Sequence, residues 1–183
     1  MESWHGIAVI FSQTLIAAVF TASAVGKVRD LSGFTKSIGT FKVVPDSWLR
    51  FVARLLLAAE VTTVALLAVG VLPAVDRAIP LGLGLGVLLL VTYTVGLVSV
   101  RARKMHVNCH CFGATTVPVS WYDVVRNGVF VAGAALGLAA GVPADRPTAT
   151  DAILIALIAL AAALVITNLS NVVNTAIRVG GTD

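Results

Sequence analysis

Two cysteines and two histidines occur together in a short polar stretch of an otherwise apolar chain. The stretch reads RARKMHVNCHCFG and covers residues 101–113. It contains both cysteines of the chain, Cys109 and Cys111, and two of its three histidines, His106 and His110. Thiols and imidazoles so close together predict either thiol–disulfide exchange or the binding of a soft metal ion, and an inert loop is the third alternative.

Thiol–disulfide exchange is favoured by the cations that precede the cysteines. Two cysteines separated by one residue can form a disulfide where the backbone turns, because their Cα atoms must lie about 4.4–6.8 Å apart. We expect so small a ring to be strained, and strained disulfides are the labile, catalytic kind. The positive charges of Arg101, Arg103 and Lys104 should raise the fraction of the reactive thiolate.

Metal binding would use the same cluster of side chains. Two thiolates and two imidazoles, from His106, Cys109, His110 and Cys111, suit Zn²⁺ or Cu⁺. Structural zinc sites usually separate paired cysteines by about two to four residues and complete the site with a second, distant pair. This sequence has one residue between its cysteines and no second pair. Redox chemistry is therefore the preferred interpretation, and a metal site remains the alternative.

The rest of the chain predicts helices that cross a membrane. Of its 183 residues, 58% are hydrophobic and 12% are charged, which is about half the charged fraction of a soluble domain. Apolar runs of about 20 residues, long enough to span a bilayer, recur along the sequence. The alternation of polar and apolar residues that a membrane β-barrel requires is absent from the sequence. We predict an all-α, polytopic membrane protein that forms a single domain over residues 1–183.

Five membrane spans are expected, and their approximate ranges are 7–25, 49–72, 79–100, 119–140 and 151–178. The connection between the first two spans is basic and amphipathic. Its apolar residues recur at helical spacing, so we expect it to lie along the membrane surface; these residues are Phe34, Ile38, Phe41 and Val44. Two sets of glycines predict close helix packing: Gly82, Gly84 and Gly86 in the third span, and Gly133, Gly137 and Gly141 in the fourth.

Positive charges predict the orientation of these spans. In a five-span arrangement most cations lie on one side of the membrane, namely Lys27, Arg29, Lys36, Lys42, Arg50, Arg101, Arg103, Lys104 and Arg178. The other side has only Arg77 and Arg146. The positive-inside rule then places the N-terminus outside, and the C-terminus and the cysteine loop in the cytoplasm. The net charge of +4 is thus attributed to membrane anchoring, and nucleic acid is not an expected partner.

Glu60 lies near the middle of the second predicted span. An ionised carboxylate costs roughly 2.5–3.5 kcal/mol at that depth, so it should face the interior of the bundle and have a cationic partner. The expected partners are Arg54 on the same helix and Arg126 on the fourth span. Such a pair could fix the register of the helices, or Glu60 could act as a proton acceptor or a ligand-binding carboxylate.

The NCHCFG element resembles the Cys-x-Cys-Phe-Gly signature of the MauE branch of the DoxX-like membrane proteins, which is named for methylamine utilisation. Other stretches that carry the resemblance are ASAVGKVRDLSGFTKSIGTFKVVP, LLLAAEVTTVALL around Glu60, and VPVSWYDVVRN at the start of the fourth span. The resemblance covers most of residues 1–140. It implies a four-helix transmembrane bundle over 1–141, to which a fifth, C-terminal transmembrane helix at 151–178 is added. His110 stands where the family pattern has a small residue, often Gly, and this departure keeps metal coordination open.

The resemblance also implies a redox-associated protein of the bacterial inner membrane. Relatives are linked with thioredoxin-like periplasmic proteins and with disulfide formation or reduction in exported proteins, so a thioredoxin-fold protein is the expected partner. A quinone is a further candidate, because the vitamin K epoxide reductase group uses a similar four-helix arrangement. By position, Cys109 and Cys111 would be the catalytic pair. Supporting roles would fall to His106, His110, Lys27, Glu60, Arg126 and Asn127.

One expectation conflicts with another. Action on exported proteins requires cysteines that are reached from outside, whereas the charges place their loop inside. A single pair cannot relay electrons between two dithiols of its own, so it needs a partner protein, a quinone or alternating exposure of the same pair. A non-catalytic role as a membrane chaperone or anchor subunit is the remaining alternative.

Overall fold

The computed structural model describes residues 3–41, 44–72, 75, 77–103, 121–141 and 148–180, with side chains described as far as residue 168. Within these ranges all regular secondary structure is helical, as predicted. In the described part of the chain, five helices are long and apolar enough to cross a membrane: α1 (Ser3–Arg29), α3 (Leu49–Val69), α4 (Ala78–Ala102), α5 (Trp121–Ala140) and α6 (Ala149–Gly180). The helix α2 (Leu31–Thr40) and the short 3₁₀ helix η1 (Asp46–Trp48) connect α1 to α3.

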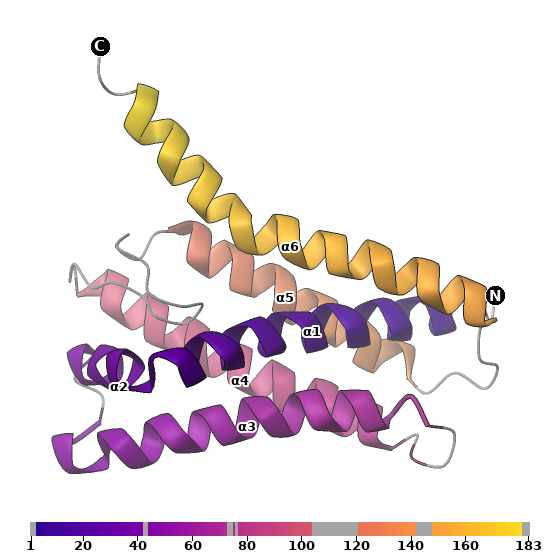
Figure 1. Ribbon diagram of the computed structural model, residues 1–183, viewed down its shortest axis with the longest axis horizontal. Coiled ribbons are helices and arrows are strands. Elements are labelled where there is room, and N and C mark those ends of the chain that lie inside the picture. The colour runs from indigo at the N-terminus through magenta and orange to yellow at the C-terminus, as the bar shows by residue number, and fades with distance from the viewer. Residues whose placement is uncertain are drawn as a thin grey trace.

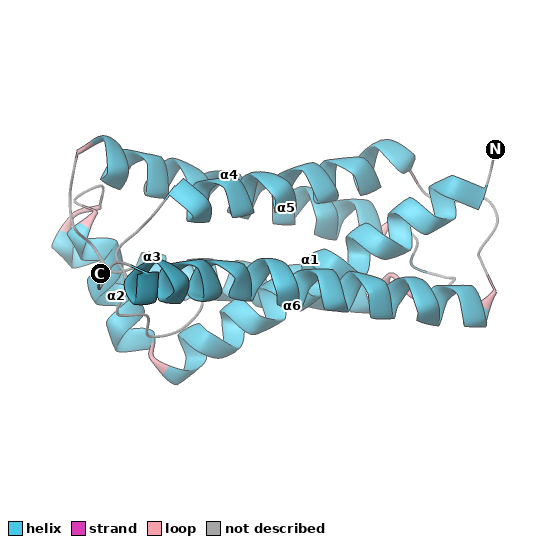
Figure 2. Ribbon diagram, turned by 90° about the horizontal axis from the view of Figure 1, so that it is seen from above, coloured by secondary structure: helices cyan, strands magenta, loops and turns pink. Residues whose placement is uncertain are grey.

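Helices α1, α3, α4 and α5 form the four-helix bundle that the family resemblance implies. Each packs on two of the others, in the order α1, α3, α4, α5 and back to α1 (Figures 1 and 2). The helix α6 packs on α1 from outside this ring, where Ala159 and Ala163 join the core that contains Ile16 and Phe20 of α1. The first helix is therefore covered on three sides by α3, α5 and α6.

Small residues allow α1 and α5 to approach closely. A Cβ atom added at Gly137 would lie 2.5 Å from the Cβ of Ser12, and one added at Gly133 would lie 3.0 Å from Cδ2 of Leu15. These two positions therefore confirm the predicted packing role. The third glycine of that set, Gly141, has another role, because it follows the end of α5 with a φ of +72° that favours a residue without a Cβ.

The glycines of α4 divide in the same way. A Cβ added at Gly82 would lie 2.8 Å from Cδ2 of Leu67, and one at Gly86 would lie 3.1 Å from Cγ2 of Ile16. At Gly84, in contrast, an added Cβ would meet no atom within 4 Å. The prediction of close packing is thus confirmed for Gly82 and Gly86 and is wrong for Gly84, which lies on another side of the helix.

The helix α2 reverses the chain after α1 and packs on α3. Asp30 begins it as an N-cap, accepting a hydrogen bond from the backbone N–H of Gly33 at 2.8 Å. The buried side chains of Phe34 and Ile38 pack with Ala53 of α3. The apolar face for which the sequence predicted a membrane-surface position is therefore in contact with the protein itself.

One end of the bundle contains the helix ends that come before and after the cysteines in the sequence, and we call it the α2 end. It is formed by α2, the C-terminal ends of α1 and α4, and the N-terminal ends of α3 and α5 (left in Figure 1). The aromatic side chains of Trp48, Trp121 and Tyr122 are exposed there, as is typical of residues at the lipid headgroup level. Arg103, the last described residue before the cysteines, caps the C-terminal end of α4, and Trp121, the first described residue after them, begins α5. Both therefore belong to this end.

Candidate functional site

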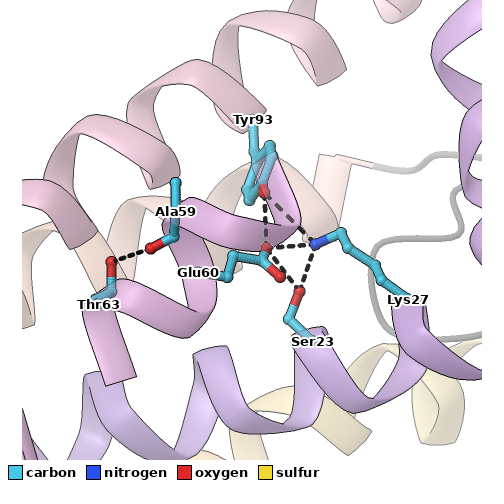
Figure 3. Close-up of polar contacts among 6 residues, drawn as sticks. All are labelled: Ser23, Lys27, Ala59, Glu60, Thr63 and Tyr93. Atoms are coloured by element: carbon cyan, nitrogen blue, oxygen red, sulfur yellow. Dashed lines mark hydrogen bonds and ion pairs between the residues drawn. The ribbon is translucent and has the colours of Figure 1, made fainter. Parts of the chain in front are cut away.

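Glu60 is the centre of a buried polar cluster that joins three helices. Its carboxylate has no exposed surface, and Oε1 forms an ion pair with Nζ of Lys27, which is equally buried. The hydroxyl groups of Ser23 and Tyr93 donate hydrogen bonds to the same oxygen, at 3.0 Å and 2.6 Å. We call Ser23, Lys27, Glu60 and Tyr93 the carboxylate cluster (Figure 3).

The ammonium group of Lys27 is surrounded on several sides. Besides its ion pair, Nζ donates a hydrogen bond to Oγ of Ser23 at 2.7 Å and lies 3.5 Å from the hydroxyl oxygen of Tyr93. It also lies 4.9 Å from the ring centroid of Phe34 and 4.8 Å from that of Tyr93, where the aromatic faces attract a cation. A charge taken out of water is tolerated when it is paired and hydrogen-bonded in this way.

The local sequence explains how these groups meet. Ser23 and Lys27 are four residues apart on α1 and therefore share one face of the helix. The chain reverses directly after α1, and this reversal lets Phe34 of α2 cover Lys27. Thr63, one turn beyond Glu60, donates its hydroxyl to the Ala59 carbonyl at 2.9 Å within α3 (Figure 3). The buried donors that converge on Glu60 thus come from α1 and α4.

The prediction that Arg54 or Arg126 pairs with Glu60 is wrong. Arg54 is exposed on α3, and Arg126 forms an ion pair with Asp123 one turn away on α5, at 3.3 Å. The actual partner, Lys27, lies near the end of its span, where a lysine normally extends into the headgroup region. The return of α2 across α1 buries it instead.

The second carboxylate oxygen of Glu60 is in a different environment. Oε2 is buried and has no hydrogen-bond partner among the residues that the structure describes. Leaving a buried acceptor without a donor is costly, so Oε2 is the atom of Glu60 that is open to a further hydrogen-bond donor. The contacts that the structure shows are those of Oε1, and they hold α1, α3 and α4 together.

The other predicted site residues fall in two groups. Asn127 is buried on α5 next to Arg126. The proposed redox pair and its histidines, Cys109, Cys111, His106 and His110, lie outside the described residues. In the part of the chain that is described, no group of three or more His, Cys, Asp or Glu residues is placed to hold a metal ion.

Two members of the cluster were not identified from the sequence, Ser23 and Tyr93. Each had a signal that could have revealed it. Ser23 is one helical turn from Lys27, and Tyr93 brings a hydroxyl group into a strongly apolar span, where a buried tyrosine usually finds a partner.

Known proteins are similar to this chain over both the four-helix bundle and the carboxylate cluster. Residues 6–140 match the family described as "Methylamine utilisation protein MauE". Methylamine utilization protein MauE of Paracoccus denitrificans is 35% identical over 133 residues, which are 72% of this chain and 68% of that protein. The protein of the same name from Paracoccus versutus is 32% identical over 139 residues, 75% of this chain and 72% of that protein. No solved structure matches. The family match includes the carboxylate cluster and both cysteines and ends with α5, so α6 lies beyond it.

Proposed function

Because the chain belongs to the MauE family of membrane proteins, we propose that it is a thiol–disulfide redox protein of the bacterial cytoplasmic membrane. Cys109 and Cys111 would exchange electrons with a thioredoxin-fold partner. The observation that carries the proposal is the cysteine pair itself, between α4 and α5 and directly after the cations of residues 101–104. The named relatives are methylamine utilisation proteins, so methylamine utilisation is the process that we propose the exchange to serve.

The proposed reaction balances with the partner alone. The thiolate of one cysteine attacks a disulfide of the partner, forms a mixed disulfide and displaces one partner thiolate. The thiolate of the second cysteine then attacks the mixed disulfide, which gives a disulfide between Cys109 and Cys111 and a dithiol on the partner. Two electrons and two protons pass to the partner, and the reverse sequence reduces the chain. A second carrier, another dithiol protein or a quinone, returns the pair to its starting state.

We assign the carboxylate cluster a positioning role in this reaction. Tyr93 attaches α4 to α1 and α3 through Glu60, and α4 ends at the residues that lead into the cysteines. Arg103, just after that end, donates a hydrogen bond to the Phe41 carbonyl at 3.3 Å. Both contacts fix the point from which the cysteine-containing residues start.

The same cluster argues against Glu60 as part of a path for metal ions. The charge of its carboxylate is already balanced by Lys27, so a second cation at Glu60 would be repelled by the ammonium group. This favours redox exchange over metal transport. For the orientation we propose an external N-terminus and a cytoplasmic C-terminus, following the positive-inside rule.

Trapping of the mixed disulfide tests the proposed function. In Cys109→Ser or Cys111→Ser the reaction should stop at its first covalent step, because the resolving thiolate is missing. We expect one of these variants to form an adduct with a thioredoxin-fold protein, visible on a non-reducing gel and identified by mass spectrometry. The variant without cysteines is the control and should form none.

The variant His110→Gly separates redox exchange from metal binding. It keeps both thiols and removes one of the four candidate metal ligands, so partner oxidation should continue. Stoichiometric Zn or Cu in the purified wild-type protein, lost in His110→Gly together with its activity, would contradict the proposal. Full activity of the cysteine-free variant would contradict it as well.

A further inference from the structure

An apolar pocket of about 240 Å³ lies between α2, α3 and α4 at the α2 end. Its walls are the apolar face of α2, Val52 and Leu56 of α3, and residues of α4 from Thr92 to Ser99. The hydroxyl groups of Thr92 and Ser99 each donate at 2.7 Å to a carbonyl of their own helix. The pocket therefore offers carbon surface to its occupant and few free polar groups.

The position of the pocket along α4 suits a lipid chain. From Thr92 to Ser99, the part of α4 that lines the pocket, the helix rises by about 10 Å, which is about a third of the roughly 30 Å hydrocarbon core of a bilayer. The pocket is thus short enough to lie within one leaflet, and α4 ends about one turn beyond it. Its volume is below the roughly 300–1,000 Å³ of pockets that enclose a whole small-molecule ligand, so it fits part of a molecule, such as a segment of one acyl chain.

The rim of the pocket is positively charged. Phe41 lines the pocket, and its carbonyl accepts a hydrogen bond from Nη1 of Arg103. An exposed guanidinium group carries five N–H donors, so it retains donors for a phosphate group. Further exposed cations on the elements of this end are Arg29, Lys36, Arg50 and Arg101. Among the described residues, the acids at this end are Asp46, which is exposed, Asp30, which caps α2, and Asp123 of α5, which pairs with Arg126.

We propose that an anionic phospholipid binds this pocket, with one acyl chain between α2, α3 and α4 and its phosphate on Arg103. Basic sites between transmembrane helices are known to recognise anionic headgroups. Phe34 and Tyr93 line the pocket and also face the ammonium group of Lys27. The bound acyl chain therefore covers the carboxylate cluster on the side that faces the lipid. This inference does not depend on the cysteines, so the lipid-binding test can fail while the test of the redox function succeeds, and the reverse.

A substitution at Gly96 tests where the acyl chain of the lipid binds. Gly96 lines the pocket, and a Cβ added there would lie 3.9 Å from Cε2 of Phe41, an ordinary contact. Gly96→Leu should fill the pocket, whereas Gly96→Ala is the matched control that adds only this Cβ. With dioleoyl phosphatidylglycerol titrated into the full-length protein, native mass spectrometry should show at least about tenfold weaker binding in Gly96→Leu, since Leu displaces several methylene groups of the ligand. Gly96→Ala should bind as the wild type does.

A substitution at the rim tests the headgroup. Dioleoyl phosphatidylcholine carries the same chains without the net negative charge, and the wild type should bind it more weakly than phosphatidylglycerol. Arg103→Gln should remove this difference, while Arg77→Gln, an exposed cation at the opposite end, should keep it. Equal binding of the two lipids by the wild type would overturn the proposal.

A photo-crosslink on the wild type keeps the proposal testable if Gly96→Leu does not fold. Phosphatidylglycerol with a diazirine in one acyl chain should label peptides of α2 and of α4 around residues 92–99. Labelling confined to other helices would overturn the proposal, as would undiminished binding to a folded Gly96→Leu. Displacement of the lipid by equimolar ubiquinone would also overturn it, because the pocket would then be a quinone site.

Discussion

The two halves of α1 are held in the bundle by different kinds of contact. In the first half, Ser12 donates a hydrogen bond to the Gly133 carbonyl at 2.7 Å, and Gln13 donates to the Leu67 carbonyl at 2.6 Å. Near the end of the helix, Ser23 and Lys27 bind a side chain, the carboxylate of Glu60. Main-chain acceptors are available whatever the sequence of the neighbouring helix, whereas a carboxylate must be supplied by one residue.

The two halves of α1 therefore depend on different things: the first half on close packing, and the second half on specific polar side chains. The first half of α1 approaches α5 through glycine and is dense. The last turns contain a buried charge pair, and the helices around them leave a pocket. Polar residues that are costly to bury are commonly retained in membrane proteins for a function. We therefore expect the second region to be sensitive to the chemistry of its side chains and the first to their size.

The largest effect is expected from breaking the ion pair. Glu60→Leu leaves the Lys27 ammonium buried without its counter-ion, and the free energy of unfolding should fall by about 3–5 kcal/mol. Lys27→Met should have an effect of similar size for the same reason. The double variant removes both charges and should recover most of the loss. Steric trapping in bicelles measures all three values against the wild type.

The folded double variant also decides what the cluster does. If Glu60 positions α4 through the hydrogen bond from Tyr93, the double variant lacks this contact and should form the mixed disulfide with its partner more slowly than the wild type. Tyr93→Phe, which keeps the ion pair, should slow the reaction in the same way. A double variant that forms the mixed disulfide at the wild-type rate would contradict the positioning role.

A smaller effect is expected from adding one methyl group to the densely packed region. Gly137→Ala brings a Cβ to 2.5 Å from the Cβ of Ser12, and overpacking of this kind costs about 1–3 kcal/mol. Gly84→Ala is the matched control, because no atom lies within 4 Å of its added Cβ. It should leave stability unchanged or raise it slightly. Equal losses of unfolding free energy from both substitutions would contradict the conclusion that Gly137 is closely packed and Gly84 is not.

The smallest losses of unfolding free energy are expected from removing a single hydrogen bond in each half of α1. Tyr93→Phe keeps the ring beside Lys27 but removes the donor to Glu60, and should cost about 1.5 kcal/mol because the acceptor is charged. Ser12→Ala removes a bond to a neutral carbonyl and should cost about 0.5–1 kcal/mol. Unfolding measurements on both variants test the order. A larger loss from Ser12→Ala would contradict the stated difference between the two regions.

The sequence was sufficient to predict the helices but not how distant residues meet. Apolar runs predicted all five spans, and α3 and α4 begin within one residue of the expected positions. The residues between the first two spans do not reveal that α2 turns back onto α3. The sequence pattern of an amphipathic helix is the same whether its apolar face contacts lipid or protein. That reversal is what buries Lys27.

The candidate site was predicted in part for the same reason. The depth of Glu60 required a cationic partner, and this requirement is met. The identity of the partner depends on tertiary structure, since Lys27 precedes Glu60 by a whole loop and a helix. Tyr93 was missed because a single tyrosine in an apolar span fits simple core packing equally well. The cysteine pair remains a prediction from the sequence.

The most direct test of the redox function counts free thiols in native membranes. Membranes are treated with a mild oxidant or with a reductant, and an alkylating reagent that adds mass to each free thiol is then applied. We predict two labelled thiols per chain after reduction and none after oxidation, as a reversible bond between Cys109 and Cys111 requires. Two labelled thiols under both conditions would contradict the account.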